Sequence, residues 1–289
     1  MAAGSRFAFV QLEFGWPLGP ADGRYLFRPE PGADPERVIV LNTIGAPRRS
    51  RLRGRRPRAV EEADAEPVPV ARVTLVRAEP FESAGGAARW LEELRGNAEA
   101  LAAEVVDGLR RLNGVLRAHR VAAADPHGRE VTREQALAVR VGYGDGEQVA
   151  DGRFEAAYEV PLRRGGSRRT ERLLPPERLA GLLGGHEELP ASEELLLRAR
   201  ADLDAARPRE AALQARIALE ALLAEGGEGA AEAIAALGAD RGPVGEAANA
   251  ALAGDPPAEL EAAVRGAVER MELAVRRRRL ASTVDRPPR

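Results

Sequence analysis

The sequence predicts an α+β protein: a mainly antiparallel N-terminal sheet covered by one long helix, followed by an all-α C-terminal domain. In the first 170 residues, strand-like segments lie before and after a long amphipathic helical pattern. From residue 171 to residue 289 only helical, alanine-rich patterns occur. A chain of 289 residues is also long enough for two domains. We therefore place a domain boundary near residue 170, in the arginine- and glycine-rich stretch at 163–169.

Six segments of the first domain have the alternation or the β-branched content of strands. They are residues 7–14, 24–28, 37–44, 70–77, 137–143 and 153–160. Alternate residues from Ala8 to Phe14 would share one face, which predicts a strand with one face in the core. The apolar run from Val38 to Leu41 is typical of a central strand covered on both faces. Gly144 to Gly152 is rich in Asp-Gly turn signals and predicts a hairpin-like connection.

A helical pattern runs without interruption from Ala87 to Arg120. At 1.5 Å per residue this helix would be about 50 Å long, so it must span the domain or break. Gly96 and Gly108 are the expected bends. Its apolar stripe, which we expect to cover the sheet, contains five large residues. These are Leu91, Leu94, Leu101, Val105 and Leu112.

Two arginine clusters are the candidate sites for contact with a partner or with phosphate groups. The first lies in a charged, proline-bounded insert at about 47–69, which we expect to be flexible. It comprises Arg48, Arg49, Arg51, Arg53, Arg55, Arg56 and Arg58. The second, at the end of the last helix, comprises Arg276, Arg277, Arg278 and Arg279. The alternative is that the first is a solvated loop offset by its own acidic residues and the second complements a helix dipole.

The sequence lacks the residues that several kinds of catalysis require. The chain has no cysteine and no lysine, which excludes thiol catalysis, cysteine-bound metals, Schiff-base chemistry and a phosphate-loop lysine. The three histidines do not have metal-ligand spacing, and the acidic loop with Asp145, Glu147 and Asp151 does not match a calcium loop. No Gly-x-Ser-x-Gly motif occurs. We therefore predict no metal and no cofactor.

Helices are expected at 175–183, 192–206 and 208–225, followed by two short alanine-rich helices and a last helix that begins at Asp255-Pro256. Glu193 to Glu225 resembles the helical hairpin of tetratricopeptide or HEPN-type proteins. The tetratricopeptide aromatic positions and 34-residue period are missing, and no histidine follows His186 to complete an Arg-x4-6-His motif. The resemblance therefore implies a helical hairpin and no function.

These observations favour a non-enzymatic interaction, assembly or regulatory protein that binds a protein partner or itself. The first alternative is a nucleic-acid-binding protein that uses the arginine segments, although 43 basic and 45 acidic residues leave a net charge of only −2. The second is an enzyme whose carboxylates and arginines meet only in the fold. With no membrane span and no secretory signal in its pattern, and with arginine as its only strongly basic residue, the chain is expected to be a cytoplasmic protein from a high-GC bacterium.

Overall fold

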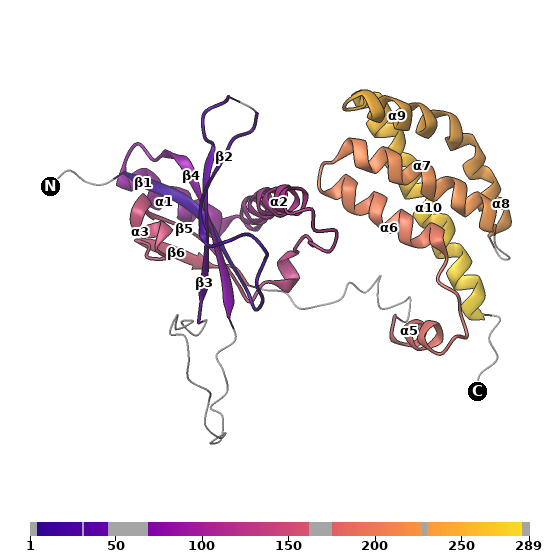
Figure 1. The fold of residues 1–289 in the computed structure, drawn as a ribbon, viewed down its shortest axis with the longest axis horizontal. Helices are drawn as coiled ribbons and strands as arrows, with labels where there is room; N and C mark the ends of the chain where they lie inside the picture. Colours follow the sequence, from indigo (N-terminus) through magenta and orange to yellow (C-terminus); the bar gives the residue numbers. More distant parts are fainter. Residues whose placement is uncertain (1–4, 31, 46–68, 162–174, 227–229, 285–289) are drawn as a thin grey trace, which may run out of the picture. The chain divides into compact units, whose positions relative to one another are not determined.

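The computed structural model describes residues 5–30, 32–45, 69–161, 175–226 and 230–284 (Figure 1). The chain divides into two compact units, Met1–Arg164 and Gly165–Arg289. The first unit, here the sheet unit, contains an antiparallel sheet with helices, and the described residues of the second, the helical unit, form helices and no strand. The predicted α+β class is confirmed. The arginine-rich part of the insert, 48–58, lies outside the described residues.

All six predicted strands are present and form one sheet in the order β2-β3-β4-β1-β5-β6. Their bounds are β1 Arg6–Phe14, β2 Gly23–Phe27, β3 Arg37–Ile44, β4 Val70–Pro80, β5 Ala138–Asp145 and β6 Ala156–Glu159. Every neighbouring pair is antiparallel. β3 is next to the edge strand β2 and is not central, although Ile39, Val40 and Leu41 are all buried.

The long helix breaks at one of the two expected glycines and runs through the other. Helix α1 spans Ala84–Gly96, and α2 spans Ala98–Ala122. The break falls at Asn97, whose side chain accepts hydrogen bonds from the backbone of Glu99 and Ala100 and thereby caps α2. Gly108 does not bend the chain. It lies in α2 against β1, where a Cβ atom at its position would be 3.0 Å from Cγ1 of Val10.

Helices α1 and α2 cover one face of the sheet, as predicted. The large residues of the predicted stripe are all buried. Four of them meet Val10, Leu12 and Phe14 of β1 and residues of β3, β4 and β5 in one core, and Leu91 packs in a neighbouring cluster with Tyr143 of β5. Ion pairs add to this contact: Arg37 of β3 binds Asp107 of α2 at 2.7 Å, and Arg77 of β4 binds Glu104 of α2. This first face of the sheet is therefore closed.

The predicted hairpin-like connection does join two antiparallel neighbours, β5 and β6, but its local structure differs from the expected turn. The segment between β5 and β6 is not a simple hairpin turn but contains a short helix, α3, at Gly146–Ala150. The Asp145 side chain accepts a hydrogen bond from the backbone of Gln148 and so starts the helix. Val149 of α3 is fully buried against Phe9 and Val76. Its packing draws the connection back over the second face of the sheet.

In its described part, the helical unit contains α5 to α10 and one 3₁₀ turn. The helices are α5 Pro175–Leu183, α6 Ala191–Asp204, α7 Pro208–Glu225, α8 Ala231–Ala236, α9 Arg241–Ala253 and α10 Ala258–Val284. Helices α6 and α7 form the expected hairpin, and α10 packs against α6, α7 and α9. Four alanines of α7 are fully buried with Leu219 and Met271, and such small side chains let helices pack closely. No helix among the described residues is long and apolar enough to cross a membrane.

Two glycines of α2 should respond to the same substitution with opposite signs. Gly108→Ala gains helix propensity of about 1 kcal/mol but forces a methyl group against Val10, a stiff side chain of a central strand, at an overpacking cost of about 1–3 kcal/mol. Gly114 has no neighbour within 4 Å of its Cβ position, so Gly114→Ala should stabilise by about 0.5–1 kcal/mol. Denaturant unfolding followed by tryptophan fluorescence measures both, because Trp16 and Trp90 lie in the sheet unit. Equal stabilisation by both variants would contradict the close approach of α2 to β1.

Candidate binding groove

The second face of the sheet carries an apolar row across four strands. The register places Leu26 of β2 beside Val38 of β3, Val38 beside Val76 of β4, and Val76 beside Phe9 of β1. With neighbouring strands about 4.8 Å apart, this row extends for about 14 Å across the sheet. A row of this kind on a sheet face normally packs against another layer.

Only one end of the row is covered. Phe9 is fully buried because Val149 of α3 lies on it and the Phe154 ring packs beside it, with 5.3 Å between the ring centroids. At the other end, Leu26 remains 60% exposed. Helix α3 therefore forms a wall at one side, and the row continues from under it into the open.

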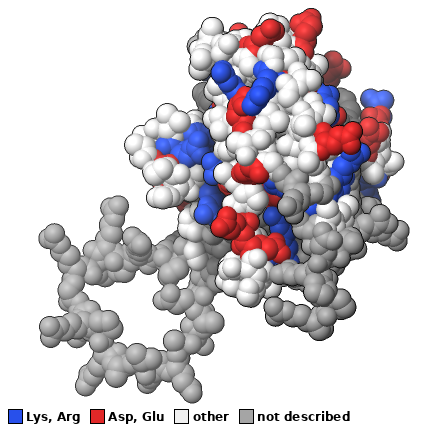
Figure 2. Space-filling view, turned by 90° about the vertical axis from the view of Figure 1, so that its right-hand side faces the viewer, with Lys and Arg blue, Asp and Glu red and all other residues white. Residues whose placement is uncertain are grey.

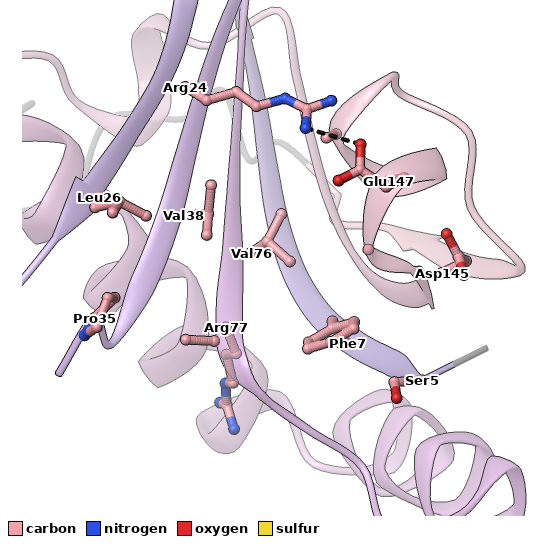
Figure 3. Close-up of a pocket in the computed structure, with 13 residues that line it drawn as sticks. Ser5, Phe7, Arg24, Leu26, Pro35, Val38, Val76, Arg77, Asp145 and Glu147 are labelled. Atoms are coloured by element: carbon pink, nitrogen blue, oxygen red, sulfur yellow. Dashed lines mark hydrogen bonds and ion pairs between the residues drawn. The ribbon is translucent and has the colours of Figure 1, made fainter.

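The uncovered part of this row forms a groove with a volume of about 460 Å³ (Figure 3). Its apolar lining includes Phe7, Leu26, Val38, Val76 and Ala150. Figure 3 shows Val38 and Val76 between Leu26 on one side and Phe7 on the other. The volume lies within the range of about 300–1,000 Å³ that is usual for ligand sites.

Charged residues lie around this apolar lining. Arg24 of β2 reaches across to α3, where its Nη1 atom is 2.8 Å from Oε2 of Glu147 (Figure 3). Both side chains of this ion pair are largely exposed. Asp145 and Ser5 lie on the side of the groove that α3 and β1 form. The guanidinium of Arg77 points away from the groove, toward Glu104 and the Trp90 ring on the first face of the sheet.

Beyond the groove, the second face combines the buried Val40 with polar side chains that pair with one another. Gln11 and Thr74 are buried and hydrogen-bonded at 3.1 Å. Glu13 accepts hydrogen bonds from Arg72 and from Arg140, each at 3.0 Å. Buried polar groups of this kind are stable when each finds a partner. The open apolar surface of the second face that we describe is therefore the groove.

Three described carboxylates have shifted pKa values, and all three shifts are downward. Burial by itself raises the pKa of Asp107, but hydrogen bonds and positive charge from Arg111 and Arg37 outweigh it. A hydrogen bond from Arg241 lowers the pKa of the exposed Glu220. General acids need the opposite shift, toward neutral pH. These carboxylates are therefore suited to ion pairing.

The third carboxylate, Glu193, is the centre of an arginine cluster in the helical unit. Its side chain is only 4% exposed. Arg178 of α5 donates to Oε2 at 2.7 Å, Arg279 of α10 donates to the same oxygen at 2.5 Å, and Arg278 donates to Oε1 at 3.2 Å. Burial raises the pKa of Glu193, but the hydrogen bonds and charges of Arg279 and Arg178 more than offset this, so the pKa lies below its ordinary value.

The structure thus gives half of the second predicted arginine cluster an internal role. Arg278 and Arg279 bind Glu193, and Arg278 also donates to the Gly226 carbonyl at 3.0 Å. Arg277 is exposed, and Arg276 is half-buried. To bind phosphate groups, Arg278 and Arg279 would have to leave a buried carboxylate. The first cluster, from Arg48 to Arg58, lies outside the described residues, so contact by either cluster stays a prediction.

Charges of both signs intermingle on one face of the described surface. On the face shown in Figure 2, arginines and acidic side chains alternate, and no patch of one sign dominates it. Within the described ranges, no group of histidines and carboxylates is arranged to hold a metal ion. The acidic loop residues Asp145 and Glu147 instead belong to α3 and the groove.

Sequence reasoning did not find the groove, although one signal for it was present. Phe7 and Phe9 alternate with the even-numbered core residues of β1, so the first half of that strand is apolar on both faces. Val38 and Val40 extend the same pattern to β3. The Glu193 cluster had no comparable signal, because its three arginines lie 15, 85 and 86 residues from Glu193 in the chain, on two other helices.

No protein-family model, no curated protein and no solved structure matches this chain. The groove and its rim therefore have to be interpreted from their own geometry and chemistry.

The Glu193 cluster predicts a specific acid sensitivity of the helical unit. Because the pKa of folded Glu193 lies below its ordinary value of 4.5, its ion pairs contribute fully above that pH and are lost as the pH falls through the folded pKa. At pH 7, Glu193→Gln should cost about 3–5 kcal/mol, since it leaves buried guanidinium groups without their carboxylate. Below pH 4.5 the gap between the variant and the unsubstituted protein should narrow.

Guanidinium unfolding followed by far-ultraviolet circular dichroism measures this effect. Tryptophan fluorescence serves as an internal reference, because both tryptophans lie in the sheet unit. Glu194→Gln is the matched control: Glu194 is the next residue, is about half exposed and makes only a surface pair with Arg198. Equal losses from both variants, or a gap that does not change with pH, would refute the cluster's role.

Proposed function

We propose that this chain is a non-enzymatic interaction protein whose sheet unit binds a short segment of a partner protein in the groove. One observation carries the proposal: the apolar row of the second sheet face continues from beneath α3 into an open groove. Burying apolar surface contributes about 25 cal/mol per Å², so covering this row would favour association. The exposed charges around it can orient the bound segment without being buried.

The groove suits a segment of a macromolecule better than a small enclosed ligand. Sites for small molecules bury most of the ligand surface. Here the Leu26 wall is 60% exposed, and the Glu147 side chain opposite is 79% exposed. A side chain that projects from a larger partner can fill such an open groove while the partner covers its walls. Interfaces commonly use one apolar anchor of this kind with a polar rim.

A peptide selection tests the proposal and requires no identified partner. A phage-displayed library of random 12-residue peptides is selected on the immobilised full chain, and Kd values of enriched peptides are measured by fluorescence polarisation. The double variant Leu26→Gln, Val38→Thr keeps side-chain size but makes the groove polar. It should weaken binding about tenfold, equivalent to about 1.4 kcal/mol.

The matched control makes the same two changes elsewhere, as Leu137→Gln and Val106→Thr. Leu137 and Val106 are 49% and 52% exposed and do not line the groove. The control should change Kd by less than about twofold, and both variants should retain the unfolding transition of the sheet unit. Peptides that bind both double variants equally well, or a selection that yields none, would contradict the proposal.

A further inference from the structure

The charges at the groove are unevenly divided. Among the described residues that line it, Arg24 is the only basic side chain directed toward the groove, because Arg77 is held on the first sheet face. Asp145 and Glu147 are the acidic lining residues. Asp151 lies 3.9 Å from Arg24 but is itself paired with Arg153 at 3.4 Å, so the uneven charge rests on the two lining carboxylates. The groove therefore has an excess of negative charge on its α3 side.

This excess of negative charge favours cationic ligands over anionic ligands. An anionic group that binds Arg24 competes with Glu147 for the guanidinium and lies close to the carboxylates of α3. A cationic group can bind the carboxylates of Asp145 and Glu147 while Arg24 keeps its place. Because these groups are exposed, each new pair contributes modestly, and the contribution falls with salt.

We infer that the occupant of the groove is a basic peptide segment, in which an apolar side chain packs on the row from Leu26 to Val76 and a neighbouring arginine or lysine binds the carboxylates of α3. This inference rests on the proposed function and adds the chemistry of the partner. The apolar anchor supplies affinity, and the cationic residue supplies orientation and selectivity.

Two charge reversals test this chemistry, and each serves as the control for the other. Arg24→Glu and Glu147→Arg both break the same ion pair, but they change the charge of the groove in opposite directions. For a basic peptide from the selection, Arg24→Glu should strengthen binding about threefold and Glu147→Arg should weaken it about threefold. Both differences should shrink when the salt concentration is raised from about 50 mM to about 500 mM.

The outcomes separate this inference from the function on which it rests. If both reversals weaken binding equally, the Arg24–Glu147 ion pair only maintains the structure of the groove, and the inference of a basic partner is refuted. Enrichment of acidic peptides, with the opposite response to the two reversals, also overturns the basic partner but leaves groove binding intact. If binding does not depend on Leu26 and Val38 in the first place, the proposed function itself is refuted.

Discussion

The sheet unit depends on the unequal covering of one six-stranded sheet. Helices α1 and α2 close the first face with a continuous apolar stripe, reinforced by ion pairs such as Arg37 with Asp107. Within the sheet unit, the described helix on the second face is α3, which is five residues long. Because strand register is shared across the sheet, the apolar row that anchors Val149 necessarily continues to Val38 and Leu26. The groove is thus a direct consequence of how the strands are paired.

The helical unit is stabilised differently from the sheet unit. Its core combines many alanines with leucine, valine and methionine, and the small alanine side chains let the helices pack closely. Three arginines also converge on the buried Glu193, and Ser192 donates to Glu225 beside it. Buried charges are costly unless they are paired, and here the pairs join α5, α6 and α10. These ion pairs, together with the apolar core, hold the three helices together.

Much of the fold could be predicted from local sequence patterns. The alternation from Ala8 to Phe14 and the stripe of α1 and α2 identified the first sheet face, because periodicity directly reports which residues share a face. Of the two expected bends, the helix does break directly after Gly96, whereas it continues through Gly108. Gly108 was an expected bend because it is a glycine within a helical pattern. Its lack of a side chain instead allows α2 to approach Val10. The cap at Asn97 separates the two helices.

The candidate site was harder to predict because it depends on contacts between distant segments. Leu26, Val38 and Val76 come from three strands, and only the register reveals that they are neighbours. Likewise, Arg278 and Arg279 appeared in the sequence as a basic end of a helix. Their pairing with Glu193 is a tertiary contact over 85 and 86 residues. Local composition therefore suggested that Arg278 and Arg279 are available to bind a partner, and it did not identify the groove.

Methyl NMR of the full chain provides the most direct test of the central claim that the second sheet face is the ligand surface. With isotope-labelled leucine and valine methyl groups, a selected peptide is titrated into the protein. We predict shift changes for Leu26, Val38 and Val76, whereas Val105 and Leu112, buried beneath α2 on the first face, remain unchanged. Saturating shift changes confined to other residues, with Leu26, Val38 and Val76 unaffected, would contradict the claim.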